Sequence, residues 1–142
     1  MYVTAFLVLL ILYAVISMKL EEWATISTLG FRIEVPQGFM DRPEMYFYVE
    51  YGLLFLAAII AAAADGFRFL YLSTAMLITL AIVYFLAKYF GRKRAYNTFR
   101  RNHLILAKNE SDPTVRAELE DTARLTDKEL KHRLELLREF AT

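Results

Sequence analysis

Residues 46–90 read YFYVEYGLLFLAAIIAAAADGFRFLYLSTAMLITLAIVYFLAKYF, and this stretch decides the fold. It contains two long apolar runs, Tyr46–Ala64 and Phe69–Phe90, which are joined only by residues 65–68. A helix needs about 20 mostly apolar residues to cross a bilayer core of roughly 30 Å. Each run therefore predicts a membrane-spanning helix. Because the link between them is so short, the two helices are expected to form an antiparallel hairpin, with Asp65 capping the start of the second one.

A third apolar run opens the chain. Residues 1–18 contain no charged side chain, and Lys19, Glu21 and Glu22 follow directly. The run is longer than the roughly 7–15 apolar residues of a signal peptide and has no basic residue before it. We therefore interpret it as a retained helix. The predicted fold is an all-α integral membrane protein with three transmembrane helices plus a short helical cytoplasmic tail.

The composition agrees with a chain made of two unlike parts. Hydrophobic residues make up 57% of the 142 residues, above the roughly 45–50% of an average soluble protein. The charges are concentrated near the C-terminus, where residues 91–142 hold 12 of the 17 basic and 9 of the 16 acidic residues. We predict a transmembrane region over 1–91 and a basic segment with an amphipathic helical tail over 92–142. The absence of cysteine excludes disulfides and thiolate metal sites.

The distribution of basic residues predicts the orientation of the chain. In short loops, Lys and Arg accumulate on the cytoplasmic side of a membrane. The residues of this kind beside the end of the third run are Lys88, Arg92, Lys93, Arg94, Arg100 and Arg101. The 65–68 turn holds only Arg68, and the first run holds none. We expect a cytoplasmic C-terminus and an outside N-terminus, in a bacterial inner membrane.

Small residues mark a helix-packing surface on the second run. Ala57 with Ala61, and Ala58 with Ala62, are pairs spaced four residues apart. In lipid, such pairs let helix backbones approach closely. Packing inside the chain is the preferred interpretation, and a contact between chains is the alternative.

One carboxylate lies well inside an apolar run. Glu50 is about one helical turn past Tyr46, and Lys88 and Arg92 are expected at the same depth on the third helix. Intramembrane carboxylates are candidates for a functional role. The preferred interpretation is an ion pair of Glu50 with Lys88 or Arg92. No histidine occurs in any apolar run, which excludes a haem held by two histidines of one chain.

The loop over 19–45 also carries local signals. Apolar residues recur with helical spacing over 20–29, and Gly30 is placed to end that helix. Residues 31–38 have the pattern of an extended segment followed by a turn. Asp41 and Glu44 form a capping pair for the next helix. The first helix is therefore expected either to continue past the membrane or to bend and lie on its surface, and residues 19–45 as a whole are expected to form an interfacial cytoplasmic loop.

The basic segment 92–108 contains six basic residues and no acidic one. Basic residues near a membrane surface attract anionic lipid. The predicted lipid-headgroup residues are Arg92, Lys93, Arg94, Arg100 and Arg101. Nonspecific RNA binding is the alternative, and we reject it because the segment adjoins a membrane helix.

Two short helices are predicted in the tail. Asp112 followed by Pro113 is a helix start, and Thr126 with Glu129 has the capping-box pattern. Isolated helices of this length are marginal in water and need a packing surface. The apolar residues predicted to dock on a partner are Val115, Leu119, Leu130, Leu134 and Leu137.

No catalytic constellation is found. The two histidines, His103 and His132, have no cysteine or carboxylate pattern around them, and no phosphate loop or nucleophile elbow occurs. We predict a non-catalytic accessory or structural subunit of a larger membrane complex, without a cofactor or metal. Its expected partners are lipids and other membrane subunits or copies of itself, but no nucleic acid. The alternatives are a self-assembling holin-like pore and a small channel or transporter component that uses Glu50.

Overall fold

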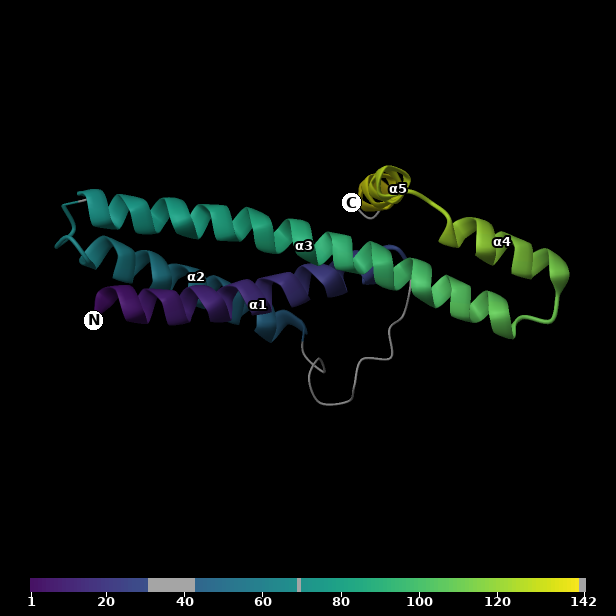
Figure 1. Cartoon of the computed structure of the whole chain (residues 1–142), viewed down its shortest axis with the longest axis horizontal. Helices are drawn as coiled ribbons and strands as arrows, with labels where there is room; N and C mark the ends of the chain where they lie inside the picture. Colours follow the sequence, from purple (N-terminus) through teal and green to yellow (C-terminus); the bar gives the residue numbers. More distant parts are fainter. Residues whose placement is uncertain (31–42, 69, 141–142) are drawn as a thin grey trace. The chain divides into compact units, whose positions relative to one another are not determined.

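The computed structural model describes residues 1–30, 43–68 and 70–140, whose course is shown in Figure 1. These residues form five helices and no strand, so the predicted all-helical fold is confirmed for them. The helices are α1 Tyr2–Thr28, α2 Pro43–Ala63, α3 Tyr71–Asn109, α4 Pro113–Ala123 and α5 Asp127–Phe140. The extended segment and turn predicted over 31–38, and the cap predicted at Asp41, lie outside the described residues.

Two helices extend well beyond the apolar runs that predicted them. α1 continues to Thr28, and Gly30 follows in the left-handed conformation with φ 86°. α3 passes through Gly91 and ends at Asn109, although its apolar run ends at Phe90. Lys and Arg end an apolar run without ending a helix, because both are good helix formers. A single interior glycine costs only about 1 kcal/mol of helix stability.

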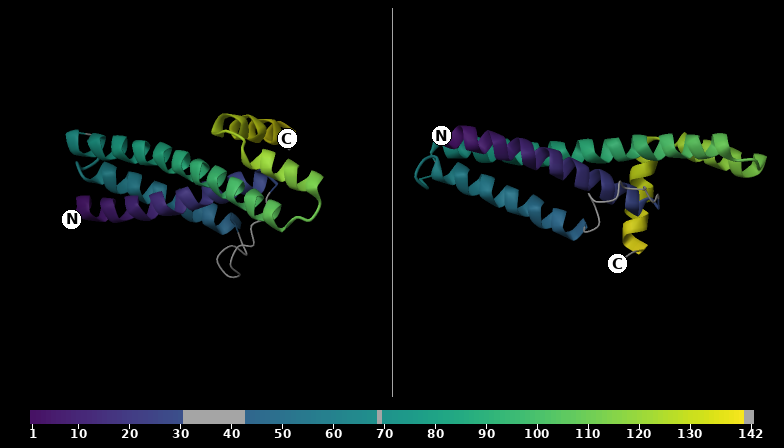
Figure 2. Two further views of the ribbon diagram at one scale, coloured as in Figure 1. Left: turned by 45° about the vertical axis from the view of Figure 1, so that its right-hand side comes forward. Right: turned by 90° about the horizontal axis from the view of Figure 1, so that it is seen from below.

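The described residues fall into two compact units, and each has its own core. Unit 1 comprises residues 1–21 and the described part of 35–91, while unit 2 comprises the described parts of 22–34 and 92–142. The core of unit 1 is formed by Phe6, Leu10, Tyr13, Ala57, Ala61, Met76 and Leu80. Since these residues come from α1, α2 and α3, the three helices pack around one apolar centre (Figure 2).

Unit 2 is held together by the apolar face of its last helix. Leu130 and Leu134 of α5 are buried against a cluster that includes Leu29, Tyr96 and Phe99. These two leucines lie four residues apart and share one face of α5. Burial in this cluster also raises the pKa of the Tyr96 hydroxyl. The amphipathic tail therefore finds its packing surface within the chain.

The tail helices begin where the capping patterns predict. The Asp112 carboxylate accepts a hydrogen bond from the Thr114 amide at 2.8 Å, at the start of α4. At the start of α5, the Glu129 carboxylate accepts from the Thr126 amide at 2.7 Å, and the Glu129 amide donates to the Thr126 hydroxyl at 3.3 Å. This reciprocal pair is a capping box, so both predicted starts are confirmed.

The turn between α2 and α3 is closed by hydrogen bonds. The Phe67 amide donates to the Ala62 carbonyl and the Gly66 amide to the Ala63 carbonyl, both at 3.0 Å. The Asp65 carboxylate accepts from the Ser73 amide at 2.9 Å, which confirms the predicted cap of the second hairpin helix. Gly66 and Phe67 have φ values of 60° and 62°. For a side chain other than glycine this left-handed conformation costs roughly 1–2 kcal/mol.

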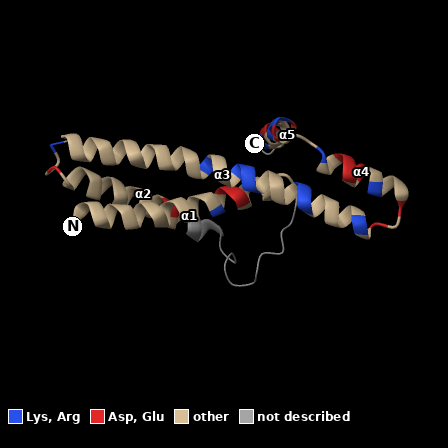
Figure 3. Ribbon diagram, viewed as in Figure 1, with Lys and Arg blue, Asp and Glu red and all other residues tan. Residues whose placement is uncertain are grey.

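Two helices, α1 and α3, are long and apolar enough to cross a membrane. The apolar part of α2, Phe47–Ala63, is shorter. Figure 3, in which the ribbon is coloured by residue type, shows few charged residues along the helices of unit 1, whereas Lys and Arg recur along the later part of α3. The helices of unit 1 therefore combine an apolar interior with a largely apolar exterior.

Candidate functional site

The main polar feature of unit 1 is an ionic cluster of three residues from three helices. Lys88 Nζ on α3 lies 2.8 Å from Glu50 Oε1 on α2 and 3.6 Å from Glu21 Oε2 on α1. Glu50 is only 2% exposed. One ammonium group thus faces two carboxylates, and the cluster, defined here as Glu21, Glu50 and Lys88, joins all three helices.

The sequence positions this cluster through helical periodicity. Tyr13, Ser17 and Glu21 are spaced four residues apart, so they follow one face of α1, and all are buried. On α3, Tyr84 precedes Lys88 by one turn, and the Lys88 ammonium lies 5.9 Å from the centre of the Tyr84 ring. This distance is within the range of a cation–π interaction. The lysine is therefore held by two carboxylates and an aromatic ring.

Two buried hydroxyl groups accompany the cluster on α1. Among the residues that the structure describes, Tyr13 Oη and Ser17 Oγ have no hydrogen-bond partner. Buried polar atoms are normally paired, so these two hydroxyls make the interior of unit 1 more polar than its apolar core residues indicate. No group of three or more metal-ligating side chains occurs in the described part of the chain.

The cluster lies beside a close approach of two helix backbones. A Cβ atom added at Gly91 of α3 would lie 2.6 Å from the Met18 carbonyl oxygen and 2.8 Å from Glu21 Cβ of α1. Distances below 3.0 Å are not found for real Cβ atoms, so only glycine fits at this position. The absent side chain brings α1 close enough to α3 for Glu21 to reach Lys88.

The structure brings together several of the residues predicted from sequence. Glu50 and Lys88 are paired, while Arg92 belongs to unit 2. Ala57 and Ala61 are fully buried in the core of unit 1, Ala62 is also buried, and Ala58 packs against that core. The alanine surface is therefore used within the chain, as the preferred interpretation holds.

Sequence reasoning missed Glu21 and Gly91. In the sequence, Glu21 follows the end of the first apolar run, and Gly91 follows the end of the third. The available signal was the four-residue spacing from Tyr13 through Ser17 to Glu21, which places a carboxylate on the buried face of α1.

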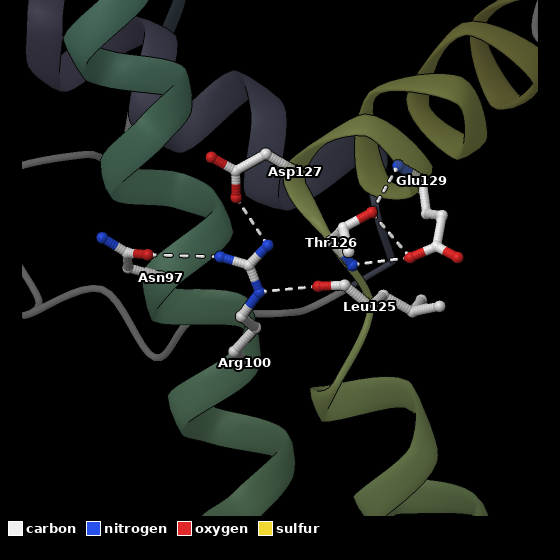
Figure 4. Close-up of polar contacts among 6 residues, drawn as sticks. All are labelled: Asn97, Arg100, Leu125, Thr126, Asp127 and Glu129. Atoms are coloured by element: carbon white, nitrogen blue, oxygen red, sulfur yellow. Dashed lines mark hydrogen bonds and ion pairs between the residues drawn. The ribbon is translucent and has the colours of Figure 1, made fainter.

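In unit 2, Arg100 joins α3 to the start of α5 (Figure 4). Its Nε donates to the Leu125 carbonyl at 2.8 Å, and its Nη2 donates to Asp127 Oδ1 at 2.5 Å. Its Nη1 donates to Asn97 Oδ1 at 3.3 Å. Arg100, one of the predicted headgroup residues, therefore has three protein acceptors for its guanidinium group.

The other predicted headgroup residues are placed differently. Arg94 Nε lies 3.8 Å from Glu22 Oε2. Lys93 and Arg101 are exposed, and Arg92 is partly exposed. Lys93 and Arg101 are therefore the members of the predicted set best placed to meet anionic lipid.

The predicted docking residues divide into two groups. Leu130 and Leu134 are buried in the core of unit 2, and Leu137 packs against that core. Val115 is exposed on α4, and Leu119 is partly exposed. Docking of a partner on Leu130 and Leu134 would require α5 to detach from the core of unit 2. Val115 of α4 is already exposed and needs no such change.

Comparisons with known proteins add no further assignment. No protein-family model matches the chain, and no match is found among curated proteins or solved structures.

Proposed function

We propose that this protein is a non-catalytic accessory or structural subunit of a larger membrane complex. It crosses the bilayer three times, through the apolar parts of α1, α2 and α3. Its N-terminus lies outside and its C-terminal tail lies in the cytoplasm, in a bacterial inner membrane. The observation that carries the proposal is the large apolar exterior of unit 1.

Burial separates a membrane helix from a core helix of a soluble protein. The most apolar windows of α1 and α3 are only 28% and 22% buried. A soluble protein would bury such helices, because water-exposed apolar area is unfavourable at about 25 cal/mol per Å². The exposed apolar side chains include Leu7, Ile11, Phe55, Ile78, Ile82 and Phe85. These surfaces are suited to lipid chains or to the apolar helices of a partner.

The exposed tyrosines of unit 1 support the same location. Tyr2 and Tyr71 lie at one end, while Tyr48, Tyr51 and Tyr89 lie near the ionic cluster. Between these two levels the exposed aromatic residues are Phe55 and Phe85, which carry no hydroxyl group. Tyrosine favours the membrane–water interface. Tyr71 and Tyr89 are separated by about 27 Å along α3, close to the thickness of the hydrocarbon core.

The ionic cluster supports a span for α2 as well. Phe47–Ala63 is about 26 Å long as a helix, and Glu50 is its acidic residue. An uncompensated carboxylate in lipid would be unfavourable, but Lys88 faces Glu50 at 2.8 Å. This internal pairing favours a structural role for Glu50 over a transport role.

The tail supports a role in assembly. The packing of α5 leaves α4 exposed, with Val115 on its surface. Lys93 and Arg101 are exposed on α3 beyond the apolar part, where they are suited to anionic headgroups of the cytoplasmic leaflet. In this proposal, α4 contacts another subunit while α3 contacts lipid.

The first test is to extract the protein from its native membrane in mild detergent and determine the mass and composition of the intact particle. Other subunits in a fixed ratio support the proposal. A pure homo-oligomer contradicts it and favours the pore alternative, which leakage assays and the Ala58→Leu variant then examine.

Two substitutions refine this test. Val115→Glu should reduce co-purification of the partner subunits without changing the helix content. Leu136→Glu, at an exposed apolar position on α5, is the matched control and should retain the partners. Equal recovery with both variants would exclude docking through α4, and deletion of 110–142 would then show whether any part of the tail is needed.

A further inference from the structure

The α2–α3 turn presents aromatic side chains on a fixed backbone. The turn is closed by the Phe67–Ala62 and Gly66–Ala63 hydrogen bonds, both 3.0 Å long. On the α3 side of the turn, the Asp65 carboxylate accepts hydrogen bonds from the amide and the hydroxyl of Ser73, at 2.9 and 3.0 Å. These bonds fix the backbone of the turn at Phe67, and the Phe67 ring is exposed.

Phe67 occupies an unfavourable position for a phenylalanine. Its φ of 62° lies in the left-handed region, where glycine is the favoured residue. Its side chain gains little within the chain in return, because Phe67 is 61% exposed. A strained backbone conformation is kept only where many surrounding contacts hold it in place, and such residues cluster at functional sites. The exposed ring is therefore available for a contact outside the chain.

The surroundings of Phe67 indicate the chemistry of that contact. Tyr71, the first residue of α3, is 94% exposed, and Leu70 and Arg68 are exposed beside it. Figure 1 shows the N-terminal end of α1, where Tyr2 is also exposed, at the same end of unit 1. Apolar rings, phenolic hydroxyls and a guanidinium group together fit the boundary between lipid chains and phosphate headgroups.

The depth of the turn fits the same boundary. Tyr71 lies about 26 Å along α3 from Lys88, which belongs to the ionic cluster at the other end of unit 1. If the cluster lies near the cytoplasmic boundary, the turn reaches the outer boundary of a hydrocarbon core of roughly 30 Å.

We propose that the α2–α3 turn is an interfacial anchor, in which Phe67 and Tyr71 insert into the headgroup boundary of the outer leaflet and Arg68 meets lipid phosphate. This inference rests on the proposed membrane location. It adds a specific lipid-binding surface at the end opposite the ionic cluster.

Depth-resolved fluorescence quenching tests the anchor. The full chain carries a single tryptophan, Trp23, so Trp23→Phe provides a silent background. In that background, Phe67→Trp is reconstituted into phosphatidylcholine vesicles whose acyl chains are brominated either near the headgroup or near the chain end. We expect a blue-shifted emission from the introduced indole and a greater loss of emission with the bromine near the headgroup.

Two further variants keep the result interpretable. Tyr71→Trp tests the same surface at an unstrained helical position, so the anchor remains testable if the substitution at Phe67 perturbs the turn. Leu136→Trp, at an exposed position on α5, is the control and should show little quenching by either lipid. Equal quenching at 67, 71 and 136, or greater loss with the deep bromine at both 67 and 71, would overturn the anchor.

Alkaline carbonate extraction of the same vesicles separates this inference from the proposed function. If the protein stays in the vesicles while positions 67 and 71 remain unquenched and water-exposed, the anchor is refuted but the membrane location is not. If the protein is washed out of the vesicles, both the membrane location and the anchor are refuted.

Discussion

The ammonium group of Lys88 on α3 lies 2.8 Å from the carboxylate of Glu50 on α2, at a site where Glu50 is almost completely buried. Removing one partner of a buried ion pair leaves an uncompensated charge, which destabilises a protein by about 3–5 kcal/mol. Lys88→Met is therefore expected to lower the free energy of unfolding by an amount of this order. Denaturant titration of the protein in detergent micelles, followed by circular dichroism, measures the change.

The matched control removes the charge on both sides. Lys88→Met combined with Glu50→Gln leaves no bare carboxylate on α2, so the double variant should be more stable than Lys88→Met alone. A single variant as stable as the parent protein would show that the ion pair contributes nothing to the packing of the three helices.

Gly91 provides a second prediction about unit 1. A methyl group at this position would lie 2.6 Å from the Met18 carbonyl oxygen, which is a backbone atom that cannot rotate away. Gly91→Ala should therefore push α1 away from α3 and destabilise the protein by about 1–3 kcal/mol. Gly52→Ala, on α2, is the control, because nothing lies within 4 Å of its added Cβ. It should be neutral or stabilising by up to about 1 kcal/mol, and equal losses at both glycines would contradict the close approach.

Arg100 and Arg101 are adjacent but have different expected roles. Arg100 donates hydrogen bonds to Leu125, Asp127 and Asn97, whereas Arg101 is exposed. Hydrogen bonds of charged groups contribute about 1.5–3 kcal/mol each when buried, and less when exposed as these partly are. Arg100→Ala should increase the hydrogen-exchange rate of α5, while Arg101→Ala should leave it unchanged. If α5 exchanges equally in both variants, Arg100 does not hold the start of this helix.

The capping box of α5 predicts a pH dependence. Hydrogen bonds from the Thr126 amide and hydroxyl hold the pKa of the Glu129 carboxyl below its usual value. A carboxyl with a lowered folded-state pKa stabilises the fold above its unfolded-state pKa, and this contribution is lost as the pH falls through the folded-state pKa. The stability of α5 should therefore decrease in acid, as measured by the helical signal of the tail.

The control for this pH effect is Glu129→Gln, which retains an acceptor for Thr126 but does not titrate. It should reduce the acid-dependent loss of α5 without removing the helix. An unchanged pH profile in this variant would assign the loss to other carboxyls of unit 2.

Local signals made part of this fold predictable. The starts of α4 and α5 depend on side chains that bond to backbone groups two or three residues away, and the cap at Asp65 reaches Ser73, eight residues away. The sequence therefore contains both partners at close range. The pairing of Glu50 with Lys88 could be proposed because both residues interrupt apolar runs at a similar depth. The four-residue spacing from Tyr13 to Glu21 could place Glu21 on the buried face of α1. Its contact with Lys88 depends on the close approach of α1 and α3 at Gly91, which is a tertiary contact without a local signature.

The tail illustrates the same limit. The leucine spacing on α5 predicts an apolar face, and Leu130 and Leu134 do form one. Periodicity does not identify what covers such a face, and here the cover includes Leu29, Tyr96 and Phe99 of the same chain. Arg100 was assigned to lipid for a similar reason: its charge can be read from the sequence, whereas its acceptors at Leu125 and Asp127 cannot.

The sharing of Lys88 by two carboxylates has a consequence for the biogenesis of a membrane-inserted chain. Glu50 is synthesised 38 residues before the lysine that neutralises it. If α2 entered the bilayer alone, the Glu50 carboxylate would lie in lipid without a counter-ion until Lys88 was inserted. Under the proposed membrane location, the favourable order would be for α2 and α3 to enter the bilayer together as a preformed hairpin, with Lys88 already beside Glu50.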